Sequence, residues 1–171
     1  MSEKIQELIV LSGLLGEPCE ESMEAIQELA PQLTWLSNEA VAEIENLPLE
    51  RWQMEHTRLF ISGHPKTECA PFESVWAEGR MMGETTHAIQ SLYNKVNYKP
   101  DAELPADYLG SELEFLAFVL ENYGEQEVFL VEILEHLHTW IPKFAKAIRI
   151  HSDLAFYRDY AKRLEALFEM H

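Results

Sequence analysis

Cysteine is scarce in this sequence, and its placement excludes two classes of small domain. The 171-residue chain has two cysteines, Cys19 and Cys69, which form no C-x-x-C pair. A zinc ribbon needs closely spaced cysteine pairs, and a disulfide framework needs several cysteines in a short secreted chain. We therefore expect a protein of a reducing compartment, with a core that needs no metal or disulfide cross-link.

Long apolar runs are also missing. No stretch approaches the roughly 20 apolar residues that a membrane-spanning helix requires. Residues 8–16, LIVLSGLLG, have the length of the apolar part of an export signal, but an acidic segment precedes them and no A-x-A cleavage site follows. These two observations predict a cytoplasmic protein.

Basic residues are few, and the acidic ones are unevenly spread. Thirteen Lys and Arg face thirty Asp and Glu, for a net charge of -17. Residues 1–57 hold 12 acidic and 2 basic side chains, and residues 99–139 hold 10 and 1, whereas residues 140–171 hold 4 and 6. Such a field makes nucleic acid an unsuitable partner and attracts a basic peptide. Acidic outer helix faces that only keep the chain in solution are the alternative.

No segment alternates apolar and polar residues for long enough to predict a strand. Apolar residues instead recur at helical spacing between Gly and Pro breakers, which predicts an all-α single domain of eight or nine helices. The expected helices cover residues 5–15, 20–29, 37–47, 49–61, 81–96, 109–124, 125–141, 143–150 and 152–170. We expect Pro142 to kink or restart the helix that contains it, and Ser152 to cap the last helix.

The chain has one obvious breaking point, near residues 98–105. Residues 97–107, NYKPDAELPAD, carry two prolines and no helical periodicity. We therefore predict an N-terminal half, residues 1–97, a hinge at 98–105 and a C-terminal half, residues 106–171. A strained hinge of this kind permits exchange of one half between two copies, so both a monomer and a domain-swapped dimer are open.

Residues 70–83, APFESVWAEGRMMG, interrupt the helical pattern with large apolar groups. Phe72, Trp76, Met81 and Met82 lie next to a loop, where aromatic and methionine side chains suit a groove for an apolar segment of a partner. The alternative is that all four side chains fill the core.

Two E-x-x-H tetrads, Glu84 to His87 and Glu135 to His138, support a different hypothesis. Di-iron carboxylate bundles use such a tetrad on each of two helices and one further Glu from each of two others, roles open to Glu55 and Glu112. The pattern is weak in a chain so rich in glutamate. The sequence contains no phosphate-binding glycine motif and no recognisable nucleophile, so we predict no cofactor and no catalytic residue.

Three blocks in order resemble the TorD/DmsD/NarJ-like family of cytoplasmic chaperones for molybdoenzyme maturation. The blocks are TRLFISGHPKTECAPFESVW (57–76), ELPADYLGSELEFLAFVL (103–120) and HLHTWIPKFAKAIRIHSDLAFYRDYAKRL (136–164). They are similar to the family's R-L-F and P-x-x-S-V-W elements, its E-x-P-x-D-H signature and its H-L-x-x-W-x-P-x-F pattern. The chain departs from the family pattern at His56, which replaces an aromatic residue, and at Tyr108, which replaces the signature His.

The resemblance implies an all-helical fold and binding in place of catalysis. The implied partner is the catalytic subunit of a molybdenum-cofactor oxidoreductase, held through its twin-arginine leader or its folded body until the cofactor is inserted. A leader of this kind needs carboxylates for guanidinium groups and apolar side chains beside them. The candidate carboxylates are Glu73, Asp107 and Glu112, and the candidate apolar contacts are Leu59, Phe60, Phe72, Trp76, Pro105 and Tyr108. Neither the client enzyme nor the oligomeric state follows from the sequence.

Overall fold

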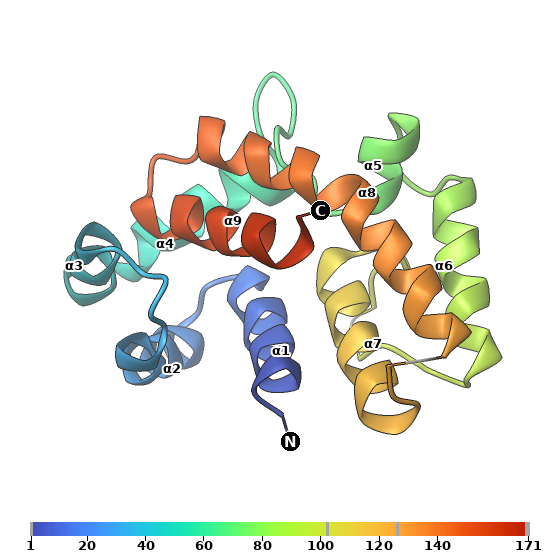
Figure 1. Cartoon of the computed structure of the whole chain (residues 1–171). Helices are drawn as coiled ribbons and strands as arrows, with labels where there is room; N and C mark the ends of the chain where they lie inside the picture. Colours follow the sequence, from blue (N-terminus) through green and yellow to red (C-terminus); the bar gives the residue numbers. More distant parts are fainter. Residues whose placement is uncertain (1, 102, 126, 170–171) are drawn as a thin grey trace. The chain divides into compact units, whose positions relative to one another are not determined.

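The computed structural model describes residues 2–101, 103–125 and 127–169, and the all-α prediction is confirmed within them (Figure 1). This part of the chain holds nine α-helices, a short 3-10 turn, a π-helix and no strand. None of its helices is both long and apolar enough to cross a membrane. The helices are α1 (Glu3–Leu15), α2 (Glu20–Leu29), α3 (Asn38–Asn46), α4 (Leu49–His56), α5 (Glu73–Glu78), α6 (Glu84–Lys95), α7 (Leu109–Asn122), α8 (Val128–His151) and α9 (Ala155–Phe168).

The helices gather into two compact units, each built from two separate stretches of chain. Unit 1 contains the chain up to Gly16 together with Pro71–Trp140. Unit 2 contains Glu17–Ala70 and the chain from Ile141 onward. The long helix α8, orange in Figure 1, therefore contributes its first part to unit 1 and its last part to unit 2.

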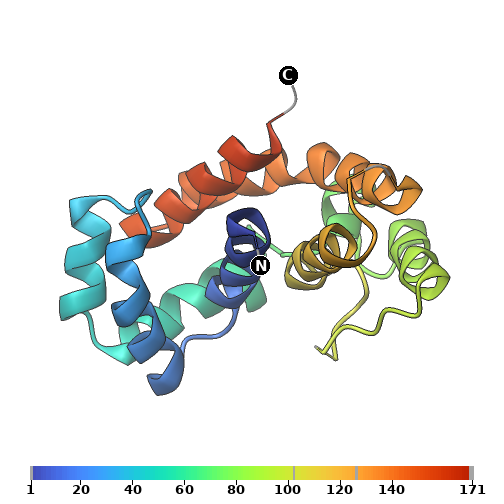
Figure 2. The ribbon, with the colours of Figure 1, turned by 60° about the horizontal axis from the view of Figure 1, so that its bottom comes forward.

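Unit 1 is organised around α7. Helix α1 packs along α7 (Figure 2). The Leu8 and Leu11 side chains of α1 are buried, and the Ser12 hydroxyl donates to Glu114 at 3.1 Å. On the α6 side, Tyr93 and Phe115 place their ring centres 4.8 Å apart in a larger aromatic cluster. Burial of these large side chains supplies the main stabilisation of the unit.

Unit 2 has an aromatic core that joins α4, α8 and α9. Trp52 meets Phe156 edge to face at 5.2 Å, and Phe60 lies 5.4 Å from Tyr157 and 6.1 Å from Phe144. Helix α3 packs on α9. The Glu43 carboxylate of α3 accepts the backbone N–H groups of Ala155 and Phe156, both at 2.8 Å.

Two local predictions are wrong: a restart of the helix at Pro142 and a helix cap at Ser152. Helix α8 continues through Pro142, with buried residues on both sides of the proline, among them Trp140 and Phe144, packing the helix in place. A kink at Pro142 stays a prediction. Ser152 does not cap α9, which begins after Leu154; its hydroxyl bonds within the connecting turn, and Glu43 satisfies the first N–H groups of the helix instead.

Two segments contain structure that helical periodicity did not predict. Residues 57–61, expected as the end of a regular helix, form a π-helix (Thr57–Ile61), and the proline-containing motif contains the short helix α5. Residues 98–105 lie between α6 and α7, and one of them, Ala102, falls outside the described residues. A hinge there stays a prediction.

Candidate functional site

The short helix α5 depends on a carboxylate from a distant part of the sequence. Its N-cap residue, Phe72, has no side chain able to accept a hydrogen bond, so the first N–H groups of the helix need an outside partner. Asp107 supplies it: its backbone carbonyl accepts from Glu73 N at 3.1 Å, and its side chain accepts from Ser74 N at 2.7 Å. The other Asp107 oxygen accepts from the Thr86 hydroxyl at 2.9 Å.

The two motif segments are also joined through their backbones. Leu109 N donates to the Pro71 carbonyl at 2.9 Å, and Phe72 and Tyr108 form an isolated antiparallel bridge with ring centres 5.7 Å apart. The segment P-F-E-S and the segment A-D-Y-L, about 35 positions apart in sequence, thus become one structural element. These contacts give the two proline-containing interruptions of the helical pattern a shared structural role.

The turn after α5 starts the next helix. Gly79 ends α5 in the left-handed region at φ 76°, a conformation that a glycine adopts without strain. The chain then turns so that the Glu78 carboxylate accepts from the backbone N–H groups of Glu84 and Thr85 at 3.0 and 2.8 Å. These bonds lower the pKa of Glu78, with the Thr85 N–H as the largest cause.

Beneath α5 lies a cluster of buried carboxyl groups. Glu73 and Glu112 are 3% and 0% exposed. Glu73 Oε2 lies 2.6 Å from His136 Nδ1, and Glu112 Oε1 accepts from the indole N–H of Trp140 at 3.1 Å. Their second oxygens, Glu73 Oε1 and Glu112 Oε2, are buried and have no hydrogen-bond partner among the described residues. The Ser74 hydroxyl is likewise buried without a hydrogen-bond partner among these residues.

The electrostatics of this cluster follow from its burial. Loss of water raises the pKa of Glu112 well above its usual range, and the neighbouring Glu73 and Asp107 charges act in the same direction. The hydrogen bond to Glu73 raises the pKa of His136, against the opposing effect of partial burial. The cluster therefore favours bound protons or another positive charge.

Apolar side chains on the same two segments reach the surface. Phe72, Trp76, Pro105 and Tyr108 are half-buried. Met81 and Met82, in the turn after α5, are 44% and 58% exposed. The motif thus combines partly exposed apolar groups with carboxylates just inside the unit, which is the combination proposed from the sequence.

Other candidate residues have structural partners in the described chain. Asp107 is completely buried and holds α5, as described above. Leu59 and Phe60 belong to unit 2, are 0% and 3% exposed and pack in its core. The structure supplies a packing role for these residues, and direct contact with a peptide stays a prediction.

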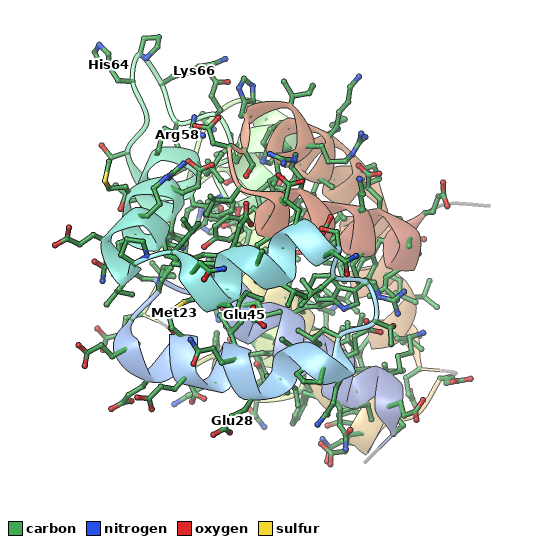
Figure 3. All side chains as sticks on the ribbon, turned by 90° about the vertical axis from the view of Figure 1, so that its left-hand side faces the viewer. Met23, Glu28, Glu45, Arg58, His64 and Lys66 are labelled. Carbon is green, nitrogen blue, oxygen red and sulfur yellow. The ribbon has the colours of Figure 1, made fainter. Side chains whose placement is uncertain are left out.

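Unit 2 carries a surface cleft that the sequence did not indicate. It has a volume of about 710 Å³ and lies along α4 and the π-helix, with Arg51, Glu55 and Arg58 in its wall. Figure 3 shows Arg58 near the base of the loop that bears His64 and Lys66, whereas the α2 and α3 side of the unit carries Glu28 and Glu45. Arg51 and Arg58 both face Glu55, and Arg58 also faces Asp153 at 3.4 Å, so the two positive charges of the cleft wall already have two carboxylates beside them.

The di-iron hypothesis receives no support from the described residues. Within residues 2–101, 103–125 and 127–169, no three His, Cys, Asp or Glu side chains stand close enough to hold a metal ion. Glu84 and His87 of the first tetrad are exposed, and Glu112 is engaged with Trp140.

Sequence reasoning missed four residues that complete the cluster: Ser74, Thr86, His136 and Trp140. Ser74, His136 and Trp140 lie inside the quoted motif blocks, and that was the available signal. Their roles depend on pairing between segments, which no local pattern reveals.

The sequence profile of a family described as nitrate reductase delta subunit matches residues 15–146, which is more than half of the chain. The chain belongs to this family. The resemblance to TorD/DmsD/NarJ-like proteins is thereby confirmed, and it places the chain among maturation proteins for redox enzymes, a family of chaperones that act on a partner enzyme.

A solved structure agrees with this family fold. The crystal structure of a candidate redox enzyme maturation protein from Archaeoglobus fulgidus superposes with a TM-score of 0.73 at 24% identity. The match covers 99% of this chain and 96% of that one, so the helical fold is shared along the whole length. No curated protein sequence matches the chain significantly.

Proposed function

We propose that the chain is a cytoplasmic chaperone that binds the twin-arginine leader of an apo-molybdoenzyme, with or without contact to the enzyme body. Binding delays export of the client until its cofactor is inserted. The chain carries out no bond chemistry in this role and uses no cofactor of its own. Family membership supports the general role, and the site in unit 1 supports the leader as the ligand.

One observation carries the proposal: the joined segments around Phe72 and Tyr108 hold partly exposed apolar groups next to buried carboxylates. A twin-arginine leader offers the complement, two guanidinium groups followed by an apolar stretch. Phe72, Trp76, Pro105 and Tyr108 are the proposed apolar contacts, with Leu59 and Phe60 retained as candidates. Glu73, Asp107 and Glu112 are the proposed acidic residues.

Titration calorimetry with a panel of twin-arginine leader peptides tests this proposal. Each peptide is paired with a twin-lysine version and measured at two salt concentrations. We expect micromolar binding to at least one leader, weakened by lysine because it lacks the planar fork of arginine, and weakened by salt. Failure of every leader to bind would overturn leader recognition and leave the enzyme body as the target.

Trp76→Ala locates the apolar contact. We expect roughly a tenfold or larger loss of leader affinity, because half-buried tryptophans are frequent binding hot spots, with a smaller relative loss of folding stability. Met54→Ala is the matched control, since Met54 is 66% exposed in unit 2. A loss of stability as large as the loss of binding energy would assign Trp76 to the core.

A further inference from the structure

The Glu73–Glu112 pair poses a hydrogen-bonding problem that the proposed function does not solve. Glu73 Oε1 and Glu112 Oε2 are buried, and neither accepts a hydrogen bond from the described residues. The two carboxyl groups are neighbours: burial raises the pKa of Glu112 most, and the charge and side chain of Glu73 raise it further. Buried oxygens of this kind are rare in native proteins because each carries the full cost of lost hydration.

A single proton solves the problem. If both groups were ionised, two like charges would adjoin in a buried site and neither second oxygen would have a donor. One proton held between the carboxyl groups gives both oxygens a partner and leaves the pair with a single negative charge. His136 Nδ1, at 2.6 Å from the other Glu73 oxygen, balances that charge when the imidazole is protonated.

The titratable groups that interact with the pair or with His136 lie on α6, on α8 and just before α7. Asp107 precedes α7, Tyr93 lies on α6, and His136, Glu132 and Glu135 lie on α8. His136 is the only group of this set that can carry a positive charge. The site is therefore short of positive charge, and a second cation would be stabilised there.

We propose that Glu73 and Glu112 share one proton in the free protein, and that a guanidinium group of the bound leader replaces this proton. This inference rests on the proposed leader binding. One positive charge enters as the guanidinium and one leaves as the proton, so the charge of the site is unchanged. His136, which contacts Glu73, is the most exposed member of the cluster, with 28% of its side chain accessible.

Infrared spectroscopy of the free protein tests the shared proton without any leader. At pH 7 we expect a carbonyl band of a protonated carboxyl group that shifts in D2O and disappears in Glu112→Gln. Glu114→Gln is the matched control, because Glu114 lies on the same helix and pairs with Ser12. Absence of the band in the unsubstituted protein, or its survival in Glu112→Gln, would overturn the shared proton.

Titration calorimetry of leader binding, in two buffers of different ionisation enthalpy, tests whether the guanidinium group replaces the shared proton. We expect about one proton released per leader bound, and an affinity that rises by up to about tenfold per pH unit while the pair still holds its proton. In Glu112→Gln the proton release should fall close to zero. Leader binding with no proton release would overturn the replacement and leave the leader function intact, whereas failure of all leaders to bind would overturn both.

Discussion

Glu55 in unit 2 and the Glu73–Glu112 pair in unit 1 are buried carboxyl groups with opposite sets of partners. In unit 2, Glu55 accepts from Arg58 at 2.8 Å and from the Ser152 hydroxyl at 3.3 Å, and the Asp153 N–H also donates to it. In unit 1, Glu73 and Glu112 each have one buried oxygen without a partner among the described residues; His136 contacts the other Glu73 oxygen, and Trp140 donates to the other Glu112 oxygen. A buried carboxylate with a full set of partners holds the fold together, and one without them is available for a ligand.

Glu55→Gln should have the largest effect on stability. The substitution removes the charge that faces Arg58 and places an amide where one acceptor oxygen stood, so we expect the free energy of unfolding to fall by roughly 2–3 kcal/mol. Denaturant unfolding measures the change. Glu50→Gln, an exposed position on the same helix, is the control; equal losses for the two variants would remove Glu55 from its structural role.

Glu43→Ala tests a second carboxylate of unit 2 whose two oxygens both accept hydrogen bonds. It removes the cap of α9, at an expected cost of about 1–2 kcal/mol by analogy with helix N-caps. Glu45→Ala, an exposed position on the same helix, should change the unfolding free energy far less. A cap that contributes nothing would show as indistinguishable unfolding curves for the two variants.

The pH dependence of the unfolding free energy should report the protonation of the unit 1 cluster. Glu112 and His136 both have a raised pKa in the folded protein. The native state therefore binds more protons than the unfolded state above the ordinary pKa of each group, and stability falls as pH rises through the folded values. We expect a downward slope above neutral pH, at most about 1.4 kcal/mol per pH unit for each proton. A flat profile from pH 6 to 9 would contradict this.

Glu112→Gln should have the smallest effect at pH 7, although Glu112 is completely buried. The amide keeps an acceptor for Trp140 and offers a donor to Glu73, as the protonated acid does, so we expect a change below about 1 kcal/mol. The variant should also lose part of the downward pH slope. A loss as large as that of Glu55→Gln would show that Glu112 is a structural anion.

Much of the fold could be predicted from the sequence because most helices are delimited locally. The periodic apolar residues and the breakers at Gly16 and Pro48 mark helix ends that the structure reproduces within a few residues. The predicted restart at Pro142 and the predicted cap at Ser152 are wrong because packing and the Glu43 carboxylate, 112 positions away from Ala155, override local preference.

The candidate site was less predictable. The motif blocks contained Glu73, Asp107 and Glu112, but type and position alone gave no indication that Asp107 caps α5 or that Glu112 faces Trp140. These roles arise from pairing of segments far apart in sequence. The burial of Leu59 and Phe60 was hidden for the same reason: an apolar pair on a helix fits a core and a groove equally well.

The four tryptophans provide the most direct test of where the leader binds, because two belong to each unit. Trp76 and Trp140 lie in unit 1, and Trp35 and Trp52 lie in unit 2. We propose to follow the four indole N–H signals by NMR during titration with a leader peptide. The account predicts shifts of Trp76 and of Trp140, whose N–H bonds to Glu112, with Trp35 and Trp52 unchanged. Shifts confined to Trp35 and Trp52 would contradict it.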